Sequence, residues 1–458
     1  MRKINDPVFG LIEINEMESR IIDSPLFQRL KYIKQLALAH YVYPGATHTR
    51  FSHSLGVFKI AGEICNTLQE YDSDLFCNTN IENLKMAALL HDIGHFPFSH
   101  ALEFEKKKER FDIKDLPFYF KISHEKFGAY IIQKSYLRSL LEENGYDYEL
   151  ICNLIEGKDI ENLIFNKIIN WELDADRLDY IIRDSYYTGV GFGKINYQYL
   201  ISNFKSFENK RIVIDSKAIR DIEHFIISRV ALYDRVYTHK TNSYFNFILA
   251  LTAYDMILNF DYPSFRNEQE LNEIIKNEEN SKSLIELSDF SYMDKMRDYL
   301  SKEGTDENTN NHINYLLFRI KNFKIFRFSS FSLKSDYEID LKKFKISNLL
   351  KALLSEYPDE IYIDIPKSKF TGYIPVSIPP SGLDEETLIR MREEEEHTIW
   401  IQHNSNPPEI FYRSKKTFFE KIHNLGITKL LVYVNKDNDE LISKFERLRE
   451  DINRIMQS

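Results

Sequence analysis

Histidine and aspartate residues of this chain gather in short segments whose composition suits a metal ion. The segments cover residues 48–56, 89–100, 123–125 and 174–180 and hold six of the 13 histidines. Within them, His53, the adjacent pair His91 and Asp92, and Asp176 would supply two imidazoles and two carboxylates to one divalent ion. Nitrogen and carboxylate ligands are compatible with Mn²⁺, Mg²⁺, Fe²⁺ and Zn²⁺, and the absence of thiolate argues against a purely structural zinc site.

A metal with four protein ligands leaves room for a water molecule, whose pKa a bound cation lowers toward roughly 7. Because such water can attack a phosphate ester, a phosphate-ester hydrolase is the first hypothesis. His95 follows His91 by four residues, so the two would share one face of a continuing helix. Gly94 allows the helix to end or bend, which would free His95 to face a substrate. One His-Asp pair is weak evidence, but four ordered segments together indicate a site.

The elements that must position these residues are mostly helical up to residue 260. Apolar residues at three-to-four spacing, such as Leu26, Leu30 and Ile33, predict helices. The predicted helices cover residues 21–35, 53–70, 82–93, 123–142, 147–156, 176–186 and 219–259. Strands are predicted at 360–365, 398–403 and 429–434, and a mobile loop is predicted at 304–311. We therefore predict a mostly α fold, with a helical core over residues 1–260 and a C-terminal α+β lobe over residues 261–458.

Composition narrows the class of protein further. The chain has 458 residues, is 43% hydrophobic and carries a net charge of −10, which argues against nucleic acid as the main ligand. Its apolar runs are much shorter than the roughly 20 residues that span a bilayer, and the polar start gives no sign of a signal peptide. Cys65, Cys77 and Cys152 form neither a disulfide framework nor a zinc ribbon. We expect a cytoplasmic protein that has no membrane partner.

Several further motifs give the chain a specific resemblance. They are Ile4-Asn5-Asp6-Pro7, the stretch FQRLKYIKQL at 27–36, Tyr43-Pro44-Gly45 and Tyr237-Thr238-His239-Lys240. With the four histidine and aspartate segments, they make residues 2–260 resemble the HD-domain deoxynucleoside triphosphate triphosphohydrolases. The resemblance implies an HD-domain helical core and a dNTP substrate, which would be cleaved at the α-phosphorus to deoxynucleoside and tripolyphosphate. Little beyond residue 260 carries it.

The resemblance also implies roles for the histidines. His53, His91, Asp92 and Asp176 would hold the metal, while His95 and His124 would handle protons at the reacting phosphate. The leaving 5′-oxygen is a poor anion and needs a proton from a nearby imidazolium. Glu103 would orient the catalytic histidine, although vertebrate relatives have aspartate at this position.

The same resemblance implies the contacts of the substrate. Gln35 and Asp184 would bond the 3′-hydroxyl of the sugar, and Leu36 with Tyr237 would exclude a ribose 2′-hydroxyl. The implied phosphate contacts are Arg50, His100, Arg177, Tyr180 and Arg229. Several cationic or donor groups around a tetra-anion are what phosphoryl transfer demands.

An activator and an oligomer are the last implied features. A guanine nucleotide or dNTP activator would bind at subunit contacts of a homotetramer or dimer, through Lys3, Asp23, Gln28, Lys31 and Lys217. Lys31 replaces an arginine of the family, so a bidentate contact does not carry over directly. Two alternatives stay open: another HD-type phosphohydrolase, acting on nucleoside monophosphates, cyclic nucleotides or nucleic-acid ends, and a catalytically inactive nucleotide sensor.

Overall fold

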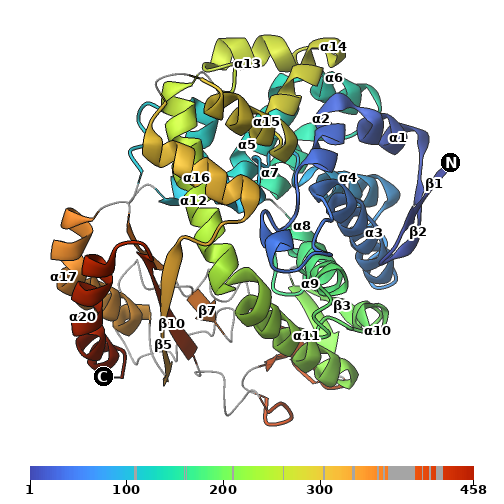
Figure 1. The fold of residues 1–458 in the computed structure, drawn as a ribbon. Coiled ribbons are helices and arrows are strands. Elements are labelled where there is room, and N and C mark those ends of the chain that lie inside the picture. Colours follow the sequence, from blue (N-terminus) through green and yellow to red (C-terminus); the bar gives the residue numbers. More distant parts are fainter. Residues whose placement is uncertain are drawn as a thin grey trace, which may run out of the picture.

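Helices dominate the protein, as the sequence predicts (Figure 1). The computed structural model describes residues 1–457 except 108–110, 159, 161, 209–210, 261, 303–304, 333–335, 358–359, 365–366, 370–397, 405, 412–413 and 419–425. The helices are α1 (Glu16–Asp23), α2 (Pro25–Gln28), α3 (Arg50–Gln69), α4 (Asn78–Leu90), α5 (His124–Lys134), α6 (Tyr136–Glu143), α7 (Tyr148–Ile155), α8 (Leu163–Ile169), α9 (Ala175–Thr188), α10 (Tyr197–Ile201), α11 (Ile219–Leu232), α12 (Lys240–Asn259), α13 (Glu268–Ile275), α14 (Glu278–Ser281), α15 (Asp289–Leu300), α16 (Glu307–Phe318), α17 (Asp336–Glu356) and α20 (Asp439–Gln457). Short turns of 3₁₀-helix include η1 (Arg29–Tyr32), η3 (Ser99–Leu102) and η6 (Ser216–Ala218).

Helix α3 lies at the centre of the core and packs against α4 and α9. Ile60, Ile64 and Leu68 on this helix are fully buried, and apolar residues occupy most of its faces. A helix that is covered on most sides needs no polar face, which explains its weak amphipathic pattern. The three packed helices carry the predicted metal residues, so the core itself brings these segments together.

Four predicted elements differ from the structure. The helix predicted at 21–35 is divided, because Ser24 ends α1 and caps α2 through its bond from the N–H of Phe27, and the 3₁₀ turn η1 and an extended Ile33 follow. The helix predicted at 123–142 is two helices, because Ser135 ends α5 and caps α6 through its bond from the N–H of Leu137. The helix predicted at 219–259 is interrupted by a π-helical turn (Tyr233–Tyr237), after which His239 caps α12. The predicted loop at 304–311 is wrong from residue 307 onward. There Asp306 caps α16, whose Ile313 and Leu316 are buried.

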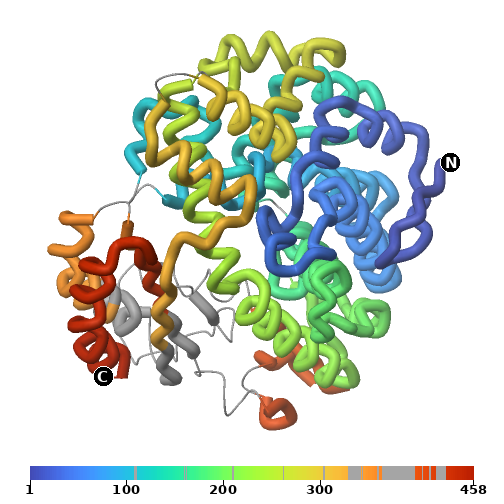
Figure 2. The backbone as a smooth tube through the Cα atoms, viewed as in Figure 1, coloured from blue at the N-terminus to red at the C-terminus, as the bar shows by residue number. Residues whose placement is uncertain are grey.

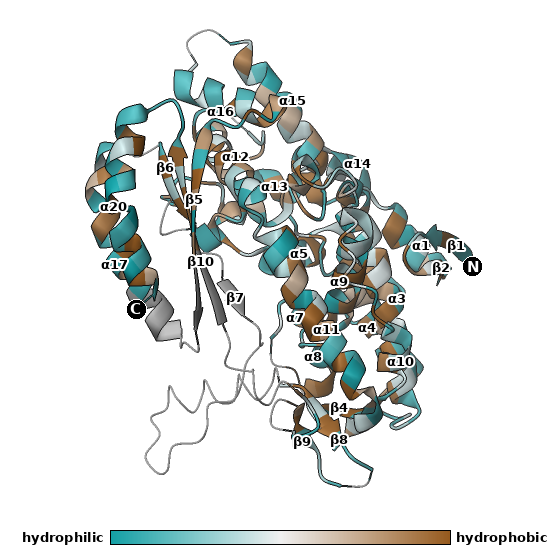
Figure 3. Cartoon of the chain, turned by 60° about the horizontal axis from the view of Figure 1, so that its bottom comes forward, coloured by the Kyte–Doolittle hydropathy of each residue, from teal (hydrophilic) through white to brown (hydrophobic). Residues whose placement is uncertain are grey.

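An antiparallel sheet organises the C-terminal lobe. Strand β10 (Gly426–Asn435) lies between β5 (Phe323–Ser332) and β6 (Ile361–Asp364), and β7 (Lys367–Lys369) also pairs with it. Alternate residues of β10 face opposite sides, as in any strand. Leu430 and Val432 face a small core with α17 and α20, while Leu431 and Tyr433 face the helical core. Figure 3 shows α17 and α20 covering one side of this sheet.

A second sheet returns the C-terminal part of the chain to the helical core. The hairpin β3 (Phe204–Phe207) and β4 (Arg211–Asp215) is extended by β8 (Trp400–Gln402), parallel to β4, and then by β9 (Glu409–Ile410). The buried indole N–H of Trp171 donates to the carbonyl of Thr398 at 3.1 Å. In Figure 2, the orange-red segment that carries β8 and β9 lies beside the green helices of the core.

Among the residues that the structure describes, the buried apolar side chains form two clusters. The large cluster contains residues from the first 260 and also Leu271, Tyr292 and Leu316 of the helices that follow. The small cluster begins at Phe326. The division of the chain at residue 260 stays a prediction, and the helices from α13 to α16 contribute to the core on its N-terminal side. None of the described helices has the length and apolar character that crossing a membrane requires.

Candidate active site

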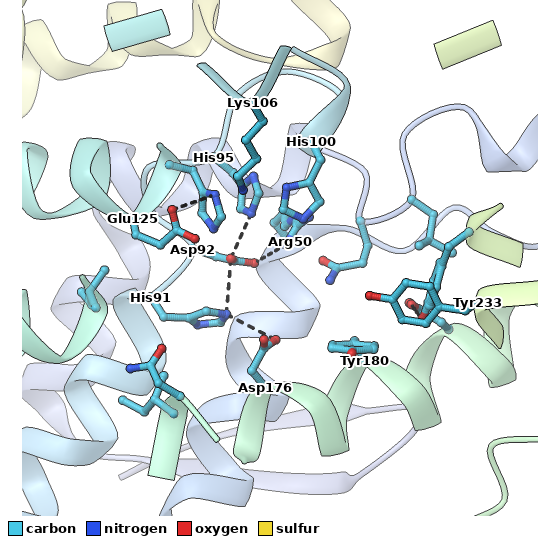
Figure 4. Close-up of a pocket in the computed structure, with 18 residues that line it drawn as sticks. Arg50, His91, Asp92, His95, His100, Lys106, Glu125, Asp176, Tyr180 and Tyr233 are labelled. Atoms are coloured by element: carbon cyan, nitrogen blue, oxygen red, sulfur yellow. Dashed lines mark hydrogen bonds and ion pairs between the residues drawn. The ribbon is translucent and has the colours of Figure 1, made fainter. Parts of the chain in front are cut away.

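The four predicted metal residues meet where three helices pack. His53 lies in the first turn of α3, His91 and Asp92 follow the last residue of α4, and Asp176 lies in the first turn of α9. Nε2 of His53 is 3.0 Å from Oδ1 of Asp176 and 3.6 Å from Oδ2 of Asp92, and Nε2 of His91 is 3.3 Å from Oδ1 of Asp92. Figure 4 shows His91, Asp92 and Asp176 facing one another at the centre of a pocket.

The hydrogen bonds of the two imidazoles fit a bound cation. Nδ1 of His53 lies 2.6 Å from Asp179, and Nδ1 of His91 lies 2.8 Å from the carbonyl of Ala88. The Nε2 atom of each ring is buried and has no hydrogen-bond partner. Acceptors at Nδ1 fix the ring so that Nε2 presents a lone pair, as metal-binding histidines usually do. These residues therefore fit a divalent metal.

The carboxylates around His53 also favour a bound cation. Burial opposes its charged form, yet Asp179, Asp176 and Asp92 raise the pKa of His53 to about 10. Burial likewise opposes the charged form of Asp176, but the neighbouring His53 lowers the pKa of this carboxyl to about 2. Carboxylates that stabilise a buried imidazolium also stabilise a cation in its place.

Beside the metal residues lies a second cluster of histidines. The rings of His95 and His124 are stacked, with centroids 3.8 Å apart, and Nδ1 of His124 is bonded to Glu103. Glu103 also accepts from Nδ1 of His100 at 3.0 Å and pairs with Lys106 at 2.8 Å. The longer side chain of glutamate thus reaches His124. In Figure 4, His95, His100 and Lys106 lie on one side of Asp92.

This cluster suits an anion better than a second cation. Both ring nitrogens of His95 are buried without a hydrogen-bond partner, and Nε2 is 3.2 Å from Asp92. Burial lowers the pKa of His95 well below its usual value, and the positive charge of Arg50 adds to the effect. Arg50 and Lys106 make this side of the pocket positive, which is what phosphate oxygens require.

The structural role of Gly94 differs from the predicted one. Helix α4 ends at Leu90, so His91 and His95 do not share a helix face. A Cβ atom on Gly94 would lie 2.1 Å from the carbonyl oxygen of His124 and 2.3 Å from the backbone nitrogen of Gly128. Glycine is therefore needed because the backbone of α5 approaches closely, and this approach sets His95 against His124.

Gly94→Ala is expected to destabilise the protein by roughly 3 kcal/mol, because backbone atoms on both sides cannot give way as a flexible side chain can. Urea unfolding measures the effect. Gly62→Ala on α3 is the matched control. Its Cβ would meet the side chain of Lys85 at an ordinary 3.6 Å, so its unfolding free energy should stay the same or rise. Equal stabilities for the two variants would contradict the close approach.

The two clusters open into one pocket of about 390 Å³. Twelve of the predicted site residues line it: Gln35, Leu36, Arg50, His91, Asp92, His95, His100, His124, Asp176, Tyr180, Asp184 and Tyr237. His53 lies behind this lining, fully buried. Sequence reasoning missed other lining residues, which are Lys106, Glu125, Ile155, Ile169, Asn170 and Tyr233. Lys106 belongs to a charged stretch whose pattern is typical of a solvated surface.

A polar group lies at the end of the pocket formed by the predicted sugar residues. The carboxylate of Asp184 accepts from the hydroxyl of Tyr237 at 2.6 Å and lies 2.7 Å from Nε2 of His48. The amide oxygen of Gln35 is buried without a hydrogen-bond partner. His48 occurs in the same segment as His53, but its residue type alone does not reveal that it holds Asp184.

Two predicted phosphate contacts are held elsewhere in this structure. Arg177 bonds to Asp174 and to the carbonyl of Trp171, and Arg229 bonds to Glu172. Neither arginine is among the residues that line the pocket. The acid that holds Arg177 lies three residues before it, at helical spacing, whereas the acid that holds Arg229 is distant in the sequence.

The predicted activator residues lie mostly on the N-terminal elements. Asp23 pairs with Arg2 at 2.7 Å, and Lys3 pairs with Glu13 at 2.9 Å across the hairpin of β1 (Arg2–Asp6) and β2 (Gly10–Ile14). Lys31 donates to the side chain of Gln28 at 2.5 Å. Lys217 lies apart in η6, where its backbone N–H bonds to Asp215.

Asp289 of α15 holds two loops that border the pocket. Its carboxylate accepts from the N–H of Phe98 at 2.5 Å and from the N–H of Lys34 at 2.9 Å. Phe98 and Ser99 both have φ of 56°, a left-handed conformation that is strained for residues other than glycine. Lys34 directly precedes Gln35, and Ser99 directly precedes His100. A residue beyond position 260 thus supports two loops that carry residues of the pocket lining.

Asp289→Asn should lower the unfolding free energy by about 1–3 kcal/mol, because an amide cannot accept both bonds. Burial raises the pKa of Asp289 to about 6. The folded state therefore binds this proton more tightly than the unfolded state, and the contribution of Asp289 to stability decreases as pH rises toward 6. Denaturant unfolding between pH 4 and 7 should show this decrease in the native chain but not in the variant. Asp294→Asn, which alters an exposed pair with Arg297, is the control. Identical pH dependence in all three proteins would contradict the prediction.

Comparison with known proteins places the chain among its relatives. Residues 50–182 match the HD domain family. An uncharacterised protein of Mycoplasma genitalium is 30% identical over 369 residues, which are 74% of this chain and 82% of that protein. Human deoxynucleoside triphosphate triphosphohydrolase SAMHD1 is 31% identical over 276 residues, 53% of this chain. An uncharacterised protein of Methanocaldococcus jannaschii is 38% identical over 244 residues, also 53% of this chain. The chain spans 42% of the human enzyme and 47% of the archaeal protein.

Solved structures extend the similarity to the whole fold. A phosphohydrolase from Bacteroides thetaiotaomicron aligns over 95% of this chain and 100% of its own, with a TM-score of 0.68 and 27% identity. A hypothetical protein from Aquifex aeolicus aligns over 100% of both chains, with a TM-score of 0.69 and 26% identity. The C-terminal lobe, which the sequence motifs do not cover, is therefore part of a shared architecture.

Proposed function

This chain belongs to the HD-domain family of phosphohydrolases, and we propose that it hydrolyses deoxynucleoside triphosphates to deoxynucleoside and tripolyphosphate with one divalent metal ion. One observation carries the proposal: a single pocket combines residues that fit a metal ion, a cluster of histidines beside Arg50 and Lys106, and polar groups that can bond a sugar hydroxyl. The similarity to a known deoxynucleoside triphosphate triphosphohydrolase agrees with it.

In this proposal His53, His91, Asp92 and Asp176 hold the metal, which is Mn²⁺, Mg²⁺, Fe²⁺ or Zn²⁺. Such a cation activates water at neutral pH and offsets the charge that develops on the phosphate. The orphaned Nε2 atoms of His53 and His91 support this assignment.

The histidine cluster would act on the leaving group. His95 and His124 handle the proton that the 5′-oxygen of the sugar needs as its bond to the α-phosphorus breaks. Glu103 keeps His124 oriented, because their side chains are bonded. Arg50, His100 and Lys106 bind the phosphates, and Lys106 is an addition to the set that the sequence predicts.

Gln35 and Asp184 would bind the sugar. The free acceptor of Gln35 suits the donor of a 3′-hydroxyl. Asp184 already accepts from Tyr237, which sets that ring, with Leu36, where a 2′-hydroxyl would clash. Tyr180 and the unpredicted Tyr233 line the same pocket. Arg177 and Arg229 would have to leave Asp174 and Glu172 in order to reach the phosphates.

An activator nucleotide and a homo-oligomer belong to the same proposal. Arg2 already neutralises Asp23, so a guanine base would have to displace this ion pair. Asp23→Ala should then abolish both activation by GTP and nucleotide-driven assembly. Unaltered assembly and activation would remove this part of the proposal.

Product analysis tests the proposed reaction. The metal-loaded protein is incubated with each dNTP, alone and with GTP, and the products are separated by ion-exchange chromatography. Deoxynucleoside and tripolyphosphate in equal amounts would support the proposal. Pyrophosphate, orthophosphate or cleavage only of monophosphates, cyclic nucleotides or nucleic-acid ends would favour another HD-type reaction. Tight nucleotide binding without turnover would favour a sensor.

A further inference from the structure

A buried chain of charged groups connects the N-terminal hairpin to the predicted metal ligand His53. Asp179 lies 2.6 Å from Nδ1 of His53 and accepts two bonds of 2.9 Å from Arg183. Arg183 donates in turn to Asp6, the last residue of β1, at 2.8 Å. The side chains of His53, Asp179 and Arg183 are 0% exposed, and that of Asp6 is 3% exposed. Each group therefore has its neighbour as its main partner.

The packing around these charged groups leaves space for them. A Cβ atom on Gly56 would lie only 1.7 Å from Oδ1 of Asp179, so the carboxylate occupies space that exists because residue 56 has no side chain. Helix α3 also holds the hairpin directly, because Nζ of Lys59 donates to the carbonyls of Phe9 and Leu11. The hairpin, α3 and α9 are thus joined within about two helix turns of His53 and Asp176.

The charges of these groups act on His53. Asp6 and Asp179 share one guanidinium, so the set keeps a net negative charge next to Nδ1 of His53. An acceptor of this kind fixes the tautomer of a metal-binding imidazole and makes its other nitrogen a stronger ligand. Arg183 holds Asp179 at two points, and Asp6 holds Arg183 at the opposite end of its planar fork.

We infer that Asp6 and Arg183 are positioning residues for His53, so that the seating of the N-terminal hairpin sets the metal affinity of the active site. Asp6 is more than 40 residues from His53 in the sequence and lies outside the pocket lining. The inference rests on the metal site of the proposed function, and it is independent of the substrate.

The test measures Mn²⁺ binding without substrate, by the electron paramagnetic resonance signal of the free ion. Asp179→Asn should raise the dissociation constant by roughly 10- to 100-fold, as loss of a partner behind a ligand usually does. Asp6→Asn should raise it by roughly tenfold. Asparagine keeps the Oδ1 acceptor for the N–H groups of Val8 and Phe9, which shape the hairpin turn. Arg183→Lys gives an independent measure, since lysine keeps the charge but cannot bond both acids as a fork.

Glu13→Gln is the matched control, because it alters an exposed pair on the same hairpin and should leave Mn²⁺ affinity unchanged. In a His53→Ala background, Asp6→Asn and Asp179→Asn should cause no further loss of Mn²⁺ affinity, since the buried charged groups act through His53. Native affinity in both Asp6→Asn and Arg183→Lys would overturn the inference, as would a full further loss without His53. If the native chain itself binds no Mn²⁺, the proposed function fails together with the inference. If the native protein binds Mn²⁺ and the variants bind it with the same affinity, only the inference is overturned.

Discussion

Asp92→Asn is expected to remove the metal and lower turnover by about 10³-fold, the equivalent of about 4 kcal/mol of transition-state stabilisation. Asp92 lies between both clusters: Oδ1 is 3.3 Å from His91 and 3.2 Å from His95, and Oδ2 is 2.9 Å from Nη1 of Arg50. Burial opposes its charge, yet Arg50 and the histidines keep the pKa of this carboxyl well below its usual value. Asparagine has the same shape but none of this charge.

Metal analysis of the purified variant and a dNTP turnover assay check the result. Glu63→Gln is a suitable control, because Glu63 is an acid on α3 that lies outside the pocket lining. It should keep both metal and activity. An Asp92→Asn protein that is folded, holds one equivalent of metal and turns over at the native rate would exclude Asp92 from the metal set.

His95→Ala and His124→Ala are each expected to lower turnover of dNTPs by about 10²- to 10⁴-fold while the metal is retained. The reason is the leaving group: the 5′-oxygen of a nucleoside needs a proton, and the stacked pair of imidazoles is the candidate donor. Thymidine 5′-phosphate esterified with nitrophenol has a different leaving group, nitrophenolate, which is a stable anion and needs no proton. Its hydrolysis should therefore fall much less in the same variants.

The comparison of the two substrates distinguishes proton donation from a structural effect. His40→Gln is the control, because His40 is half-buried outside the pocket lining, and its turnover should match that of the native chain. Equal losses for the dNTP and the nitrophenyl ester would show that these histidines do not protonate the leaving oxygen.

The helical fold could be predicted because apolar periodicity is a local property of the sequence. The clusters His53, His91-Asp92 and Asp176 could also be proposed, because each lies in a short segment with an unusual composition. The helix boundaries were harder: Ser135 separates α5 from α6 and His239 begins α12, through caps that apolar spacing does not reveal.

The partner of Arg229 could not be predicted in the same way. Arg177 and Arg229 look like phosphate ligands. Arg177 pairs with Asp174, three residues before it, whereas only tertiary packing pairs Arg229 with Glu172. Asp289 lies beyond the region of resemblance, and its two bonds are to backbone N–H groups, which leave no trace in residue type. Lys106 was hidden by a run of charges that resembles a solvated surface.

The parallel pairing of β4 with β8 has a consequence for how the chain folds during its synthesis. Val213 pairs with Trp400, so the core sheet lacks a strand until residue 400 has left the ribosome. Until then, the indole N–H of Trp171 also lacks its acceptor at Thr398. Contacts between such distant segments slow folding and leave strand edges exposed in the meantime. Nascent chains shorter than about 400 residues should therefore depend on chaperones more than the finished protein does.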